Sequence, residues 1–263
     1  MITLQHTLIT LLSLNGDEKK LKEQIPYVLL PDAIRKYTGL RVYSHFEENA
    51  RGTDVSWMKL PENLKDITAE TINKQQFYLA EGIFPAALGE KSHIEVFENH
   101  NKHLPQDYFK GVKKHITQDI IFDDFIREII DCTKKYEDKY SYNDKEFNGK
   151  EIREWLSEME THGFYILAYI LKEKFGIKAN QKWFDENVKA QLDKFYPEEL
   201  SNATYKYMTI PDKINERIEN EDWTYLNEGE VPLNKYKDMY LNVVREMYKI
   251  EKDNSIREYE EER

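Results

Sequence analysis

A histidine and an aspartate one helical turn apart are the residues of this sequence best suited to chemistry. His115 and Asp119 are separated by four positions, so in a helix they lie on the same face. Imidazole nitrogens and carboxylate oxygens are the ligands that zinc and similar divalent ions take in proteins. The pair therefore predicts a metal site on a helix, with metal-assisted hydrolysis as its chemistry.

Both residues also occupy positions that would otherwise belong to the apolar face of their helix. A buried aspartate without a partner costs roughly several kcal/mol, and a metal ion or a histidine partner removes that cost. Two interpretations of His115 and Asp119 remain open: a metal site, or a hydrogen-bonded pair within a helical core. His6, which shares a helix face with Ile2 and Ile9, is open to the same two interpretations, as a ligand or as a core histidine.

Three short stretches precede this pair in an order that resembles a known family. His6 lies near the N-terminus, Asp32 lies in a Pro-Asp-Ala triplet within Ile25–Ile34, and His45 lies in a Ser-His-Phe triplet within Tyr43–Phe46. Together with the later His-x-x-x-Asp, these motifs are similar to those of the bacterial zinc-dependent phospholipase C family, over roughly residues 1–130. That family consists of all-helical phosphodiesterases.

The resemblance implies a divalent metal site, expected to hold zinc, and a role for each matching residue. The implied metal ligands are His6, Asp32, His45, His115 and Asp119, and Asp32 and His45 are also the expected catalytic residues. A water activated by the metal would attack a phosphoester.

Two parts of the family's pattern are absent or altered in this sequence. Secreted members use the mature N-terminus and an N-terminal tryptophan as ligands, whereas here Met1 is followed by Ile2. The family also has a His-x-x-x-Glu motif, but His162, the best match, has Ile166 four residues later and Glu158 one turn earlier. His162 is therefore either a further metal ligand or a core histidine, and one or two metal ions are expected rather than three.

The elements that would hold these residues are predicted to be helices. Gly (10) and Pro (8) are scarce among 263 residues, which favours long helices. The sequence pattern predicts helices over 2–14, from 17 towards 26, and over 61–67, 68–84, 107–134, 151–175, 181–195 and 232–262, with short helices or loops at 31–38, 93–103 and 197–229. The expected fold class is a compact all-α single domain with a metal site between helices, and the charged connector at 135–150 is the one candidate sub-boundary.

Charge and composition narrow the expected substrates and location. The formal net charge of −11 argues against binding of long nucleic acid, which needs a basic surface, and leaves a small phosphoester or a phospholipid as the expected substrate. No run approaches the ~20 apolar residues of a transmembrane segment. A single cysteine excludes an intrachain disulfide, and residues 2–14 lack the basic start of a signal peptide, so we expect a cytoplasmic protein.

An alternative function is a non-enzymatic interaction protein built on a decayed metal-hydrolase scaffold. The missing terminal motif favours it, and the charged, tyrosine-rich half of the chain over 135–263 could bind a protein partner or serve as a lid. A second histidine cluster, His93, His100 and His103, matches no standard zinc spacing and is either a polar loop or an outer wall of the site. Metal content separates the two functions.

Overall fold

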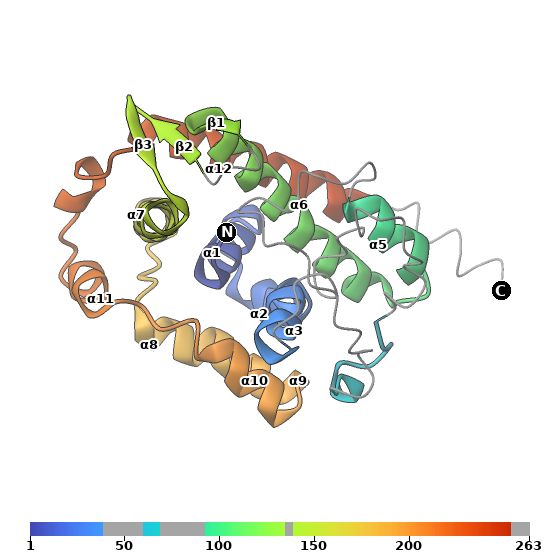
Figure 1. Cartoon of the computed structure of the whole chain (residues 1–263). Coiled ribbons are helices and arrows are strands. Elements are labelled where there is room, and N and C mark those ends of the chain that lie inside the picture. Colours follow the sequence, from blue (N-terminus) through green and yellow to red (C-terminus); the bar gives the residue numbers. More distant parts are fainter. Residues whose placement is uncertain (39–59, 69–92, 135–138, 254–263) are drawn as a thin grey trace.

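The computed structural model describes residues 1–38, 60–68, 93–134 and 139–253, and within them the fold is all-α with one small sheet (Figure 1). The helices are α1 (Thr3–Ser13), α2 (Glu18–Val28), α3 (Leu30–Thr38), α5 (His93–Asn101), α6 (Gln106–Ile129), α7 (Gly149–Phe175), α8 (Gln181–Phe184), α9 (Ala190–Phe195), α10 (Glu198–Tyr205), α11 (Asp212–Glu219) and α12 (Leu233–Lys252). Shorter segments are the 3₁₀ turns η1 (Leu64–Asp66) and η4 (Thr224–Asn227) and the π-helical η3 (Asp185–Lys189).

Helix α1 lies in the middle of the molecule, and every residue from Thr3 to Leu12 is buried (Figure 1). It packs against α2, α7 and α12. A helix that is covered on all sides is normally apolar all round, yet α1 buries Gln5, His6 and Thr10 as well as its leucines. Polar side chains in such a position need partners inside the protein, and the partner of His6 and Thr10, Gln118 on α6, belongs to the candidate site.

Helix α6 carries the His115–Asp119 pair and packs against α2, α12 and α5. Its contact with α2 is very close, because a Cβ placed on Gly111 would lie 2.3 Å from the Tyr27 Cβ. Only glycine lets the two helix backbones approach to this distance. The close crossing fixes α6 relative to α2.

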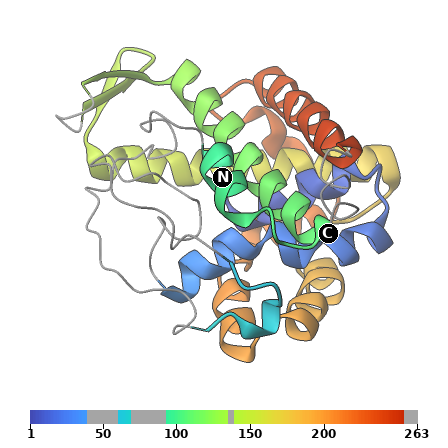
Figure 2. The same ribbon diagram turned by 90° about the vertical axis from the view of Figure 1, so that its right-hand side faces the viewer.

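The small sheet was not expected from the sequence. It is antiparallel, in the order β1 (Asp131–Lys134), β2 (Lys139–Tyr142), β3 (Lys145–Phe147), so the predicted helix over 107–134 is wrong in its last residues and the connector at 135–150 is in part a hairpin. Asn143 and Asp144 both have positive φ, at 49° and 61°, as in the type I′ turns that join tight hairpins. Figures 1 and 2 show the sheet on the opposite side of the molecule from α8–α10.

The other predicted helices are confirmed in large part. Asp17 caps α2 by accepting a hydrogen bond from the Lys20 amide, and α7 ends at Gly176, whose φ is +69°. Residues 30–38 form one helix, where a loop and a short helix were predicted over 31–38, and of 61–67 only η1 is helical. The predicted helix over 68–84, apart from its first residue, lies outside the described residues, as does 254–262.

One hydrophobic cluster includes buried residues from both sides of the connector at 135–150. In the part of the chain that the structure describes, no helix has the length and apolar character needed to cross a membrane.

Candidate metal centre

His6, on the buried helix α1, has one ring nitrogen held by a hydrogen bond. Its Nδ1 lies 2.8 Å from Gln118 Oε1, and the Gln118 amide nitrogen donates to Thr10 Oγ1 at 3.3 Å. Because an amide oxygen can only accept a hydrogen bond, His6 Nδ1 carries the proton in this contact. In the neutral ring the lone pair is therefore on Nε2, and this is the atom that can bind a metal ion.

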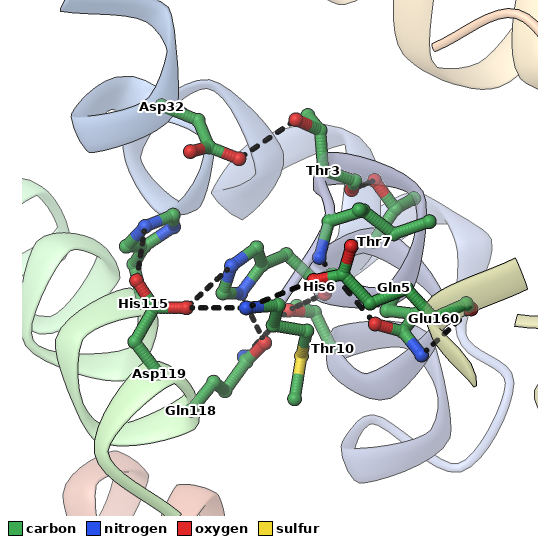
Figure 3. A network of polar contacts seen from close by, with 12 residues as sticks. Thr3, Gln5, His6, Thr7, Thr10, Asp32, His115, Gln118, Asp119 and Glu160 are labelled. Carbon is green, nitrogen blue, oxygen red and sulfur yellow. Dashed lines mark hydrogen bonds and ion pairs between the residues drawn. The ribbon is translucent and has the colours of Figure 1, made fainter. Parts of the chain in front are cut away.

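The Nε2 atom of His6 faces the carboxylate of Asp119, which lies at the edge of the two histidine rings with one oxygen near each Nε2 atom (Figure 3). His6 Nε2 is 3.2 Å from Asp119 Oδ1, without the geometry of a hydrogen bond, and His115 Nε2 is 3.5 Å from Asp119 Oδ2. A nitrogen lone pair and a carboxylate at this distance repel each other unless a proton or another cation lies between them. Neighbouring ligands of a tetrahedral zinc ion lie roughly 3.3 Å apart, given bonds of about 2.0–2.1 Å, so the spacing suits a shared ion.

The His115 ring stacks on the His6 ring, with centroids 3.9 Å apart and planes inclined by 22°. Both side chains are completely buried. Burial lowers the pKa of His115, the neighbouring His6 ring lowers it further, and the hydrogen bond and charge of Asp119 oppose the shift. Neutral imidazole is the form that binds a metal ion, so this environment favours the ligand state of His115.

Asp32 comes from α3 and completes a group supplied by three helices (Figure 3). It is 3% exposed and accepts a hydrogen bond from Thr3 Oγ1 at 2.7 Å. One ligand atom each from His6, Asp32 and His115 lie within 4.8 Å of one another. Among the described residues, this is the one place where three or more histidine, cysteine or acidic side chains converge so closely. Two nitrogen donors and carboxylate oxygens in a dry setting fit zinc.

Two further charged groups border the site that were not expected from the sequence. The Met1 amino group lies 3.3 Å from Asp119 Oδ1 and 3.6 Å from Glu160 Oε1 on α7. Burial raises the pKa of Glu160, the amino group opposes this shift, and the Asp119 carboxylate adds to it. The Asp119 and Glu160 carboxylates thus share the Met1 amino group, and the gathering of negative charge from Asp32, Asp119 and Glu160 favours a cation.

The remaining predicted ligands are not part of this group in the described structure. His45 lies outside the described residues. His162 lies on α7 but contacts the Tyr225 and Tyr236 rings, and its Nε2 is 3.1 Å from the Tyr225 carbonyl oxygen. Of the second histidine cluster, the exposed His103 lies 3.2 Å from the Leu60 carbonyl oxygen.

Sequence reasoning missed Gln118, Thr3 and Glu160. Gln118 directly precedes Asp119 and is buried in the middle of α6. Its position as a polar residue within an apolar stretch of sequence is the one feature that could have pointed to it. Thr3 and Glu160 have no such signal, because their roles depend on how α1 packs against α3 and α7.

No family model, no curated protein and no solved structure matches this chain.

Proposed function

We propose that this protein is a metal-dependent hydrolase that acts on a small phosphoester, with His6, Asp32, His115 and Asp119 as its metal ligands. The observation that carries the proposal is the approach of His6 Nε2 to the Asp119 carboxylate at 3.2 Å in a fully buried group. A buried nitrogen lone pair beside a carboxylate is costly in the absence of a cation, and a divalent ion would remove that cost. The predicted ligand His45 is part of the proposal, as a metal ligand and catalytic residue.

The side chains around these ligands have positioning roles. Gln118 holds the His6 ring through Nδ1 and so directs Nε2 towards Asp119. Thr3 orients Asp32 by donating to one of its oxygens. Such outer contacts fix the orientation and protonation of metal ligands. When bound, a divalent ion would polarise a phosphoryl oxygen and bring the pKa of a water molecule near neutrality.

The expected substrate is a small phosphodiester, a nucleotide or a phospholipid head group. The net charge of −11 opposes the approach of a long polyanion. A small phosphoester carries few charges, and the metal ion would supply the local positive charge that binds it.

Metal content is the first test. Protein purified without chelator should hold at least one equivalent of zinc or a related divalent ion, and His115→Ala and Asp119→Asn should lose it. His100→Ala, which changes a half-buried histidine on α5, is the matched control and should keep the metal. Under a tenth of an equivalent in the wild-type protein would overturn the proposal.

Activity is the second test, with a panel of phospholipid, nucleotide and chromogenic phosphoesters. Hydrolysis should stop with chelator and return with added metal, and His45→Ala should reduce turnover while helical circular dichroism stays unchanged. Bound metal with equal background rates in wild-type and His45→Ala protein would instead favour the interaction protein.

A further inference from the structure

The Gln118 amide holds the His6 ring, and the direction in which this amide points decides whether His6 can be a ligand. Its Oε1 accepts from His6 Nδ1 at 2.8 Å (Figure 3). If the two ends of the amide were exchanged, the amide nitrogen would donate to Nδ1, and the neutral ring would carry its proton on Nε2 instead. Nε2 would then point an N–H at the Asp119 carboxylate, 3.2 Å away, and would have no lone pair for a metal ion.

Thr10, one turn after His6 on α1, accepts a hydrogen bond from the nitrogen end of this amide. The Gln118 Nε2 atom donates to Thr10 Oγ1 at 3.3 Å. The hydroxyl proton of Thr10 is already engaged, because Oγ1 donates to the His6 carbonyl oxygen at 2.7 Å. An exchanged amide would place Gln118 Oε1 against Thr10 Oγ1, and one acceptor would lose its donor. Thr10 is completely buried, so this loss is costly.

Met247 on α12 is a second acceptor for the same amide nitrogen. Its Sδ lies 3.5 Å from Gln118 Nε2. A thioether is a weak acceptor and cannot donate, so it also requires nitrogen at this end of the amide. Met247 is 1% exposed. Two helices that are far apart in the sequence, α1 and α12, therefore impose the same orientation on Gln118.

An ion pair one helical turn away holds this part of α12 against α6. Lys114 precedes Gln118 by four residues, so both lie on one face of α6. Glu251 likewise follows Met247 by four residues on α12. Lys114 is 1% exposed, and its Nζ donates to the Glu251 carboxylate and to Gln24 Oε1, the latter at 2.7 Å. The two contacts at one-turn spacing fix the register of Met247 against Gln118.

We propose that Thr10 and Met247 are positioning residues of the metal centre, which orient the Gln118 amide and thereby keep His6 in the tautomer whose Nε2 can bind the ion. The packing of α12 is then coupled to metal affinity, although α12 supplies none of the proposed ligands. The inference rests on the proposed function for the presence of the ion, whereas the His6 tautomer is a property of the metal-free protein.

The tautomer is measured by NMR of the histidine ring nitrogens in metal-free, ¹⁵N-labelled protein at about pH 8, above the ordinary histidine pKa of about 6.5. Rings protonated on Nδ1 and on Nε2 differ in their ¹⁵N shifts and in their couplings to the ring protons. We expect His6 to be protonated on Nδ1 in the wild type. Thr10→Val removes the hydroxyl and keeps the branched shape, so it should shift His6 towards the Nε2–H form. Adding Met247→Leu should shift it further.

Zinc affinity is measured on the same variants by competition with a chromogenic chelator. A buried hydrogen bond is worth a factor of about 2–10 in an equilibrium, so Thr10→Val should raise the zinc Kd about 2–10-fold. Thr10→Val combined with Met247→Leu should raise it about 10–100-fold, the range for lost contacts that orient a ligand. Thr10→Ser keeps the hydroxyl and should restore the wild-type Kd and tautomer.

Thr7→Val is the matched control on the same helix. Thr7 is also completely buried, and its Oγ1 donates to the Thr3 carbonyl oxygen at 3.2 Å, as Thr10 donates to that of His6. The control loses the same kind of helix contact and should keep the Nδ1–H tautomer and the wild-type Kd.

Three results would overturn the inference: a wild-type His6 that carries a proton on Nε2, an unchanged tautomer or zinc Kd in the double variant, or equal changes in Thr7→Val and Thr10→Val. A wild-type protein that binds no zinc would instead overturn the proposed function, and the comparison of tautomers in metal-free protein would still decide whether Thr10 and Met247 orient Gln118.

Discussion

Replacement of Gln118 by methionine tests the metal centre at a residue that would not itself bind the ion. Gln118→Met keeps roughly the volume of the side chain but removes the oxygen that accepts from His6 Nδ1 at 2.8 Å. A buried N–H without a partner costs about 1–3 kcal/mol of stability. The ring also loses the contact that directs Nε2 at Asp119, and loss of such an outer contact weakens metal binding by about 10–100-fold.

These effects can be measured separately in metal-free and zinc-loaded protein. At a zinc concentration 100 times the wild-type Kd, binding stabilises the fold by about 2.7 kcal/mol. A 10-fold weaker site would give about 1.4 kcal/mol and a 100-fold weaker site about 0.4 kcal/mol at the same concentration. The variant should therefore lose roughly 3–9 °C of the zinc-induced rise in Tm, at about 2–4 °C per kcal/mol for a chain of this size.

The assay is thermal unfolding with and without zinc, with Kd from competition against a chromogenic chelator. Gln106→Met, at the start of the same helix, is the control, because the Gln106 side-chain nitrogen has no hydrogen-bond partner among the described residues. It should bind zinc like the wild type. An unchanged zinc Kd in Gln118→Met, with only the metal-free protein destabilised, would refute the role of His6 Nε2 as a ligand and leave a structural hydrogen bond.

The other predictions concern pH and two close contacts. Burial lowers the pKa of His115 in the folded protein, so below about pH 6.5 the unfolded chain binds more protons and the metal-free protein loses stability as the pH falls. In urea unfolding, the free energy of unfolding of His115→Gln should fall less steeply with decreasing pH than that of the wild type. An equally steep fall in both proteins would contradict the lowered pKa. Gly229→Ala should cost about 1–3 kcal/mol, because its Cβ would lie 2.2 Å from the His162 ring; adding His162→Ala should cost less than the sum of the two single changes, and strict additivity would count against the contact. Gly111→Ala should also cost about 1–3 kcal/mol in urea unfolding, because its Cβ would lie 2.3 Å from the Tyr27 Cβ on α2. An unfolding midpoint equal to that of the wild type would show that α2 can move away.

The sequence predicted the helices well because helix caps, helix ends and one-turn spacings each depend on residues that are close together in the chain. The Asp17 cap, the Gly176 terminus and the one-turn spacing of His115 and Asp119 are of this kind. The hairpin was missed because its strands are short and charged, and its Asn143–Asp144 turn is visible mainly through positive φ values.

The candidate site was only partly predictable, because most of its contacts join distant parts of the chain. His6 meets Gln118 across 112 positions, and Thr3 meets Asp32 across 29. Spacing along one helix carries no information about which face of another helix lies opposite. The resemblance to a phosphodiesterase family supplied His6 and Asp32 as candidates, whereas the partners that orient them emerge only when α1, α3 and α6 are packed together.

The central position of α1 has a consequence for how the protein is made. Its partners α7 and α12 follow much later in the sequence, and Gln5 reaches Tyr240 Oη at 3.4 Å across 235 positions. On the ribosome, α1 would emerge long before Leu233–Lys252 exists to cover it. Contacts between such distant segments slow folding, and uncovered apolar surface invites aggregation. Nascent chains stalled before α12 should therefore stay protease-sensitive and bind chaperones, and native protection of α1 should arise only once α12 has been synthesised.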